Sequence, residues 1–221
     1  NIGAMLGAIR YESDNHRRRL TVDARVGDRI LDNTHQIKGG DGWGRGDDFD
    51  SVRLTNEDDE NALRAAAWLH TDKILKAARE QYTKVLTNKA VTAEEEDKSD
   101  DFSQHPAARS YSVIPEPKPD RSAWRRRVKA LSLFFKKYPF IIDSSVGLHA
   151  ESVNRYILNS EGTEVVTGNP YVRLSYHLYA RTTDGMDLSR HQSYDAVSLD
   201  SLPADSVILK DMDQSAEELR A

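Results

Sequence analysis

Residues 171–181 read YVRLSYHLYAR, and the alternation in this stretch decides the fold class. The residues of one parity are apolar or aromatic: Val172, Leu174, Tyr176, Leu178 and Ala180. Those of the other parity are mainly polar: Arg173, Ser175, His177, Tyr179 and Arg181. Successive side chains of a strand point to opposite faces, so the pattern predicts a long strand with one buried face. It belongs to a strand-rich segment over residues 140–197.

Two amphipathic helices are predicted upstream of this strand. The first begins at Thr55 or Asn56 as N-cap, is followed by acidic residues that suit a helix N-terminus, and extends to about Thr87. Its apolar stripe consists of Leu63, Ala67, His70, Ile74, Ala78 and Val85. His70 is interpreted as a packed side chain and not as a ligand.

The second helix is predicted to begin at Asp120 or Ser122 and to end before Pro139. Trp124, Val128, Leu131 and Phe135 form its buried stripe, and basic residues lie largely on the opposite side. Between the helices, an acidic and proline-rich excursion covers about residues 88–120.

The N-terminal region is predicted to form a β-hairpin. Its strands are residues 4–13 and 20–30, joined by a turn at residues 14–16. Residues 32–51 contain five glycines and several aspartates, which predicts an exposed loop. After Pro203 the sequence favours a helix without a C-terminal stop signal, so we expect the chain to end within a helix.

The order of these elements predicts an α+β fold, with a mainly antiparallel sheet and two long helices packed on one face. Residues 1–221 are interpreted as a single domain. No regular alternation of strand and helix and no internal repeat is visible.

Composition narrows the functional classes. The chain has 221 residues, a formal net charge of -5 and no cysteine. Acidic residues outnumber basic ones, so nucleic acid is not an expected partner. The lack of cysteine excludes disulfides and Cys-based metal sites. No apolar run is long enough for a membrane span, and the N-terminal residues lack the pattern of a secretory signal. A cytoplasmic location without a membrane partner is expected, and the alternative is that a leader before Met5 has been removed.

No motif for catalysis or metal binding is present. The seven histidines include no pair within four residues, so the HExxH zinc motif is absent. His149 and Glu151 resemble a deaminase HxE, but the PCxxC that this chemistry requires cannot occur. No GxSxG elbow exists for a serine nucleophile. The arginine triplets at 17–19 and 125–127 are interpreted as a hairpin end and a solvated helix face. No catalytic residue and no metal ligand is therefore predicted.

A polar tetrad, Asn159, Ser160, Glu161 and Gly162, separates two strand-forming runs. A serine and a glutamate together raise the alternative of a chemical site. Asparagine suits the first position of a type I turn, and glycine suits the left-handed position that follows it. The tetrad is therefore predicted to be a structural hairpin motif.

Five phrases, in this order, resemble the N-terminal region of the TldD/PmbA family of zinc metallopeptidases, also called peptidase U62 or modulators of DNA gyrase. They are RRLTVDARVGDRILDNTH (18–35), ALRAAAWLHTDKILKAAREQYTKV (62–85), DDFS (100–103), YILNSEGTEV (156–165) and ARTTDGMDL (180–188). None of them is a catalytic signature.

The resemblance implies a noncatalytic N-terminal domain that contributes to a homo- or heterodimeric chamber and handles unfolded peptides. Zinc would lie in a C-terminal metallopeptidase domain with an HExxxH helix, which this chain lacks, so the chain alone is expected to be inactive and to hold no cofactor. An acidic domain gives no physical route to DNA, which argues against the gyrase label. The alternative is a freestanding binding or scaffold module without protease activity.

Overall fold

The computed structural model describes residues 1–37, 51–91 and 99–220. It divides the chain into two compact units. Unit 1 consists of Asn1–Asp14 and Ala107–Ala221, and unit 2 consists of Asn15–Pro106. The sequence pattern predicted one domain and did not single out this division. The units are described in turn.

Unit 1 is built on a six-stranded sheet. Its strands are β1 (Ile2–Met5), β2 (Ala8–Glu12), β5 (Arg109–Tyr111), β6 (Ile141–Leu158), β7 (Glu164–Arg181) and β8 (Asp187–Ala196). The order is β2-β1-β6-β7-β5, and β8 also pairs with β7. Every pairing is antiparallel except that of β5 with β7. The predicted α+β class with a mainly antiparallel sheet is confirmed.

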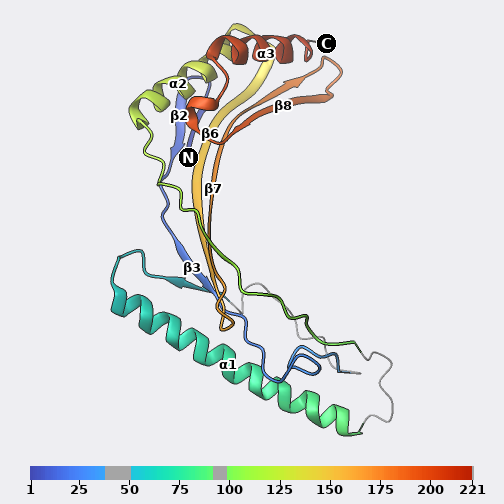
Figure 1. The fold of residues 1–221 in the computed structure, drawn as a ribbon. Helices are drawn as coiled ribbons and strands as arrows, with labels where there is room; N and C mark the ends of the chain where they lie inside the picture. The colour runs from blue at the N-terminus through green and yellow to red at the C-terminus, as the bar shows by residue number, and fades with distance from the viewer. Residues whose placement is uncertain (38–50, 92–98, 221) are drawn as a thin grey trace. The chain divides into compact units, whose positions relative to one another are not determined.

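The β6–β7 pair is the longest feature of the sheet, and Figure 1 shows it as a curved hairpin. One edge of β7 pairs with β6 along nearly its whole length. Its other edge is shared: residues 164–166 pair with β5, and residues 172–181 pair with β8. A long central strand therefore joins three neighbours.

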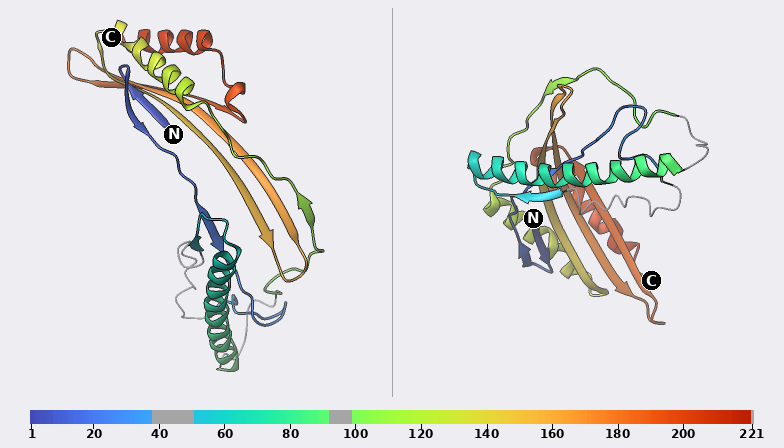
Figure 2. Two further views of the ribbon diagram at one scale, coloured as in Figure 1. Left: turned by 90° about the vertical axis from the view of Figure 1, so that its left-hand side faces the viewer. Right: turned by 90° about the horizontal axis from the view of Figure 1, so that it is seen from below.

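Two helices cover one face of this sheet, as Figure 2 shows. Helix α2 (Arg121–Leu133) continues into the 3-10 turn η1 (Phe134–Lys137), and α3 (Asp205–Glu217) follows η2 (Leu199–Ser201). Asp120 is the N-cap of α2, because its side chain accepts a hydrogen bond from the Ala123 N–H. This confirms one of the two predicted caps.

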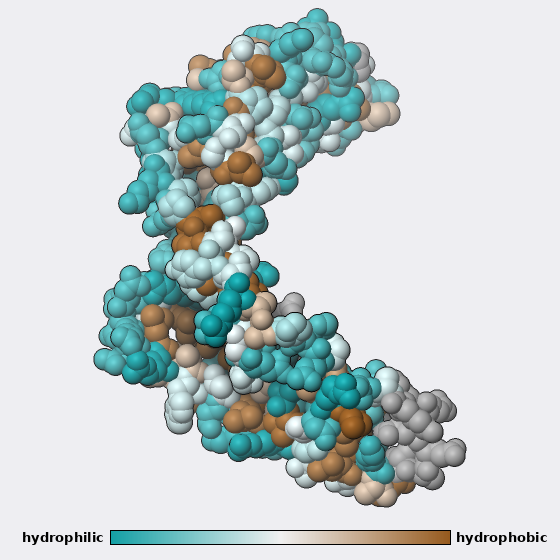
Figure 3. All heavy atoms as spheres, viewed as in Figure 1, coloured by the Kyte–Doolittle hydropathy of each residue, from teal (hydrophilic) through white to brown (hydrophobic). Residues whose placement is uncertain are grey.

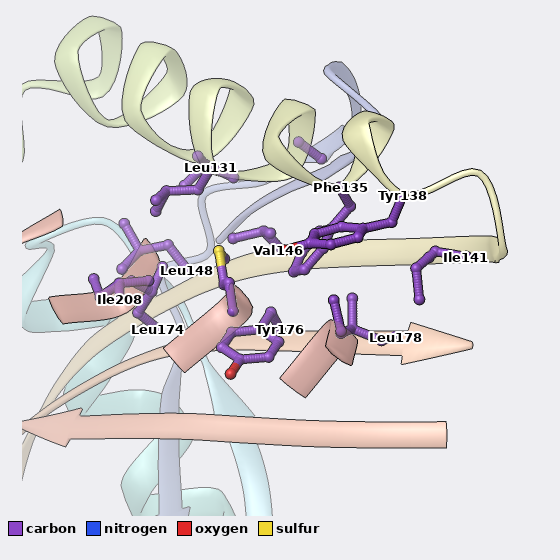
Figure 4. Packing of buried hydrophobic residues seen from close by; sticks show 14 of the residues in the cluster. Leu131, Phe135, Tyr138, Ile141, Val146, Leu148, Leu174, Tyr176, Leu178 and Ile208 are labelled. Atoms are coloured by element: carbon purple, nitrogen blue, oxygen red, sulfur yellow. The ribbon is translucent and has the colours of Figure 1, made fainter. Parts of the chain in front are cut away.

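The core lies between these helices and the sheet (Figure 4). All five apolar residues that define the alternation of β7 are at most 4% exposed. They meet two helical stripes, Val128, Leu131 and Phe135 from α2 and η1, and Ile208, Met212 and Ala216 from α3. The rings of Phe135 and Tyr176 lie 5.8 Å apart between centroids. The predicted buried face of β7 is thus confirmed.

The predicted N-terminal hairpin is wrong in its pairing. Residues 2–12 form a complete hairpin of their own, β1 with β2, because Leu6 and Gly7 both adopt positive φ values, 47° and 83°, as a two-residue turn requires. Residues 20–30 do not pair with it. Only β3 (Arg18–Thr21) is a strand there, and its partner is β4 (Ser51–Leu54) in unit 2.

Unit 2 contains β3, β4 and the helix α1 (Glu60–Val91). Four residues of the predicted stripe of α1 are buried, His70, Ile74, Ala78 and Val85, and the other two, Leu63 and Ala67, are half-buried. The predicted cap is wrong. The side chain of Asp59 caps the helix, because it accepts hydrogen bonds from the N–H groups of Asn61 and Ala62. Asp59 belongs to the acidic run itself, whereas the predicted caps Thr55 and Asn56 precede that run. The helix extends four residues past the predicted end at Thr87.

Residues 32–51 were predicted as an exposed loop, and most of them lie outside the described residues. At its start the prediction is wrong, because Asp32 and Asn33 are fully buried. At the C-terminal end of the chain, α3 ends at Glu217 and residues 218–219 form a turn.

Replacing Phe135 by alanine tests the core of unit 1. The side chain is 1% exposed and contacts the Tyr176 ring, so we expect unfolding free energy to fall by about 3–5 kcal/mol. Urea denaturation measures this change. The exposed Arg126 on α2 is the control, and its replacement by alanine should change the stability by less than about 0.5 kcal/mol.

Candidate functional site

The tetrad Asn159–Gly162 lies between β6 and β7 and closes their hairpin. The Asn159 side chain accepts hydrogen bonds from the N–H groups of Glu161 and Thr163, at 3.1 and 2.9 Å. The Gly162 N–H donates to the Asn159 carbonyl at 3.3 Å, and Gly162 has a φ of 92°. Ser160 and Glu161 are exposed. The geometry is that of a turn, with asparagine and glycine carrying its conformation.

A buried polar cluster lies in unit 2, where the segments LDNTH (31–35) and DDFS (100–103) are hydrogen-bonded to each other. Asp32 accepts hydrogen bonds from Arg25 Nη1 at 2.7 Å and from both the N–H and the hydroxyl of Thr34 at 2.6 Å. The Asp32 N–H donates to Asp101 Oδ2 at 2.7 Å. The other oxygen of Asp101 lies 2.6 Å from His35 Nδ1. Two segments far apart in sequence are thereby joined.

The neighbouring Asn33 explains why the strand predicted over residues 20–30 stops early. Its side chain accepts from the Val26 N–H at 2.7 Å and donates to the Ala24 carbonyl at 3.3 Å. These bonds satisfy backbone groups that a strand would present to a neighbouring strand. Phe102 completes the cluster, with the Arg25 guanidinium 5.0 Å from its ring centroid.

A carboxylate that orients a histidine is an arrangement found in both proton transfer and metal support. Here the pair of His35 and Asp101 is largely buried, with side chains 15% and 10% exposed. Over residues 1–37, 51–91 and 99–220, no group of three or more His, Asp or Glu side chains could hold a metal ion. The hydrogen bonds of the cluster connect residues 25–35 with residues 101–102, which is a structural role. Sequence reasoning missed it, although both segments were among the phrases that carry the family resemblance.

The second feature is the outer edge of β8 in unit 1. In the described part of the chain, β8 pairs only with β7. On the face away from the helices, Arg173 of β7 holds Asp195 of β8 through two hydrogen bonds of 2.7 and 2.8 Å. These bonds raise the pKa of Arg173 above its usual range and lower that of Asp195. The pair of Arg181 and Asp187 ties the other end of β8 in the same way, at 2.6 Å.

On the helix face, Tyr194 of β8 donates a hydrogen bond to Asp211 of α3 at 2.8 Å. Burial, followed by this bond, raises the pKa of Tyr194 above its usual range, because the ionised ring would be poorly solvated beside a carboxylate. Tyr176 makes a similar link to Ser215 at 2.9 Å. The strand β8 is thus fixed to its neighbours on both faces, while its outer backbone edge has no strand partner among the described residues.

The remaining sequence candidates lie on β6 and α2 in unit 1 and at β3 in unit 2. His149 lies 3.4 Å from Glu151 and also bonds to Asn1. The triplet 125–127 lies on α2, where Arg127 bonds to Asp205 at 2.6 Å, and the triplet 17–19 lies at β3 in unit 2. Figure 3 shows a mostly hydrophilic surface over α2 and α3, with small separate hydrophobic areas.

Replacing Gly162 by valine tests the turn. A β-branched side chain is disfavoured at a φ of 92°, so we expect the unfolding free energy to fall by at least about 1–2 kcal/mol, measured by urea denaturation. Glu161→Gln is the matched change one residue away, and it should alter stability by less than about 0.5 kcal/mol. Equal costs for both variants would contradict the role of Gly162.

Replacing Asp101 by alanine tests the buried cluster. The Asp32 N–H would lose its acceptor, so we expect its amide hydrogen to exchange about tenfold faster or more, measured by NMR. Asp100→Ala is the matched control, because Asp100 makes only an exposed ion pair with Arg29 at 3.2 Å. An unchanged exchange rate in Asp101→Ala would show that the bond does not hold the cluster closed.

No helix in the described part of the chain is long and apolar enough to cross a membrane. No protein-family model matches the sequence. No curated protein matches it either.

Proposed function

We propose that this chain is a noncatalytic peptide-handling domain of the TldD/PmbA type, and that it holds an extended peptide along the outer edge of β8. One observation carries the peptide part of the proposal. Strand β8 is ten residues long and its described partner is β7 alone, so a row of backbone donors and acceptors faces outward. An extended peptide can pair with such a row and lengthen the sheet by one strand.

The side chains of β8 support this mode of binding. The strand contains no proline or glycine, so every residue can offer both a donor and an acceptor. Its ion pairs with β7 and the bond from Tyr194 to Asp211 fix the strand before a peptide arrives. A preordered edge loses less conformational entropy on binding than a mobile one. Recognition through the backbone also suits unfolded peptides of varied sequence.

The locations of the resemblance phrases support the family part of the proposal. LDNTH and DDFS form the buried cluster around Asp32 and Asp101. NSEGT forms the turn between β6 and β7. RTTDG forms the turn between β7 and β8, where the Thr182 hydroxyl accepts from the Met186 N–H at 2.9 Å. These segments form two turns between strands and one buried hydrogen-bonded cluster, as expected of residues that are characteristic of a domain and take no part in catalysis.

A TldD-like protein would carry its zinc ion in another domain and would pair with a second TldD- or PmbA-type subunit. Both features are part of the proposal and involve no residue described above. The alternative is a freestanding binding module that uses the same edge. The reading frame of the gene distinguishes these two alternatives. A frame that continues past Ala221 and encodes HExxxH supports the peptidase assignment, and a frame that does not encode HExxxH supports the freestanding binding module.

Two neighbouring proline substitutions, His191→Pro and Gln192→Pro, test the edge. Consecutive N–H groups of a strand point to opposite sides, so one substitution removes a bond to β7 and the other removes a donor from the outer edge. We expect one variant to lose stability. The other should remain folded and bind a labelled unstructured peptide about tenfold more weakly or worse, measured by fluorescence anisotropy.

His191→Ala and Gln192→Ala are the controls, because they remove the side chains and keep both N–H groups. Both should bind the peptide with an affinity close to that of the unmodified chain. Unchanged affinity in the folded proline variant would exclude β8 as the binding edge. Cleavage of the peptide during the titration would contradict the noncatalytic part of the proposal.

A further inference from the structure

Three arginines of unit 2, Arg17, Arg19 and Arg53, line one pocket at the two-stranded sheet of β3 and β4. The register places Arg19 of β3 directly opposite Arg53 of β4, and Thr21 opposite Ser51 on the same face. Arg17 lies two residues before Arg19. Together with Arg18, these residues line a pocket of about 220 Å3, whose lining is Arg17, Arg18, Arg19, Ser51 and Arg53.

Within the described part of the chain, the charges in this pocket are only partly balanced by carboxylates. Arg18 is neutralised, since it bonds to the Asp58 carboxylate and to the Glu57 carbonyl. Within residues 1–37, 51–91 and 99–220, Arg17, Arg19 and Arg53 have no carboxylate within ion-pair distance. Three other arginines of unit 2 are paired: Arg25 with Asp32, Arg29 with Asp100 and Arg64 with Glu60. The pocket thus gathers three arginines that have no ion pair with a described carboxylate.

Like charges directly opposite each other on neighbouring strands destabilise a sheet. Because the register places Arg19 opposite Arg53, we expect the two like charges to lower the stability of the free protein, and an anion bound between the two guanidinium groups would offset that cost. Guanidinium presents a planar set of donors that matches two oxygens of a phosphate at once. A pocket lined by several such groups suits a doubly charged tetrahedral anion better than a carboxylate with one charge.

We propose that Arg17, Arg19 and Arg53 form a binding site for the phosphate group of a small ligand. The net charge of -5 disfavours nucleic acid, because a long polyanion would be repelled by the rest of the chain, whereas a single phosphate group contacts only the pocket. The site lies within unit 2 and does not depend on peptide binding at β8.

Isothermal titration of the full chain with inorganic phosphate and with phenyl phosphate at low ionic strength tests the site. We expect saturable binding of both, with tighter binding of phenyl phosphate if the pocket takes an organic monoester. Arg19→Gln and Arg53→Gln should each weaken binding about tenfold or more. Arg79→Gln is the matched control. Arg79 is an exposed arginine of α1 outside the pocket, and its removal changes the net charge equally.

A stability measurement separates a binding role from a structural one. Arg53→Glu replaces the repulsion with an attraction to Arg19, so we expect a higher midpoint of thermal unfolding without phosphate and no binding of phosphate. The unmodified chain should gain thermal stability when phosphate is added. A lower midpoint for Arg53→Glu would show that the arginine pair serves the fold.

Three further results would overturn the proposal. The first is an absence of saturable binding to either phosphate compound. The second is an equal loss of affinity in Arg79→Gln, which would indicate attraction by overall charge. The third is tighter binding of duplex DNA than of phenyl phosphate at equal phosphate concentration, which would assign the arginines to a polyanion.

Discussion

The contact between the buried face of β7 and the two helices α2 and α3 sets the position of every other element in unit 1. Tyr176 lies at its centre, with its ring against Phe135 of η1 and its hydroxyl bonded to Ser215 of α3. Burial raises the pKa of this tyrosine, so the neutral ring is the form that the core accepts. Because β7 also pairs with β5, β6 and β8, any shift of this contact would displace three strands at once.

Unit 2 is held together in a different way. The buried apolar residues of its helix α1 are few, namely Ile74, Ala78 and Val85. Much of its order comes from buried Asp32 and Asn33, whose side chains bond to backbone groups and to Arg25. A fully satisfied polar network specifies one arrangement, because each buried group left without a partner is costly. The hydrogen bonds of this polar network, more than the area of buried apolar surface, therefore determine the structure of unit 2.

The sequence predicted those parts of the fold in which a single periodic pattern decides the structure. The alternation at 172–180, the stripe of α2 and the turn of Asn159 and Gly162 are local, and each can be read from neighbouring residues. The failures involve partners far apart in the chain. Nothing near Leu20 indicates that β3 pairs with residues 51–54, and nothing near Asp32 indicates its bond to Asp101.

The candidate sites also depend on residues that are far apart in the chain, and sequence patterns do not reveal them for that reason. An open strand edge exists only once all strand pairings are known, and the opposition of Arg19 and Arg53 appears only in the register of β3 with β4. The sequence interpretation of residues 17–19 as the end of an N-terminal hairpin was wrong, because Arg18 and Arg19 belong to β3, which pairs with β4. It did not include Arg53, because a residue 34 positions after Arg19 carries no local sign of that contact.

The shared edge of β7 also has a kinetic consequence. The strands β6, β7 and β8 follow one another through short turns, so their pairing closes only small loops and can form early. Strand β1 pairs with β6, from which all of unit 2 separates it in sequence, and parallel β5 pairs with β7, from which α2 and β6 separate it. We therefore expect the meander of β6, β7 and β8 to form early and the N-terminal hairpin to dock onto it late. During synthesis, that hairpin leaves the ribosome before β6 and must wait for this partner strand.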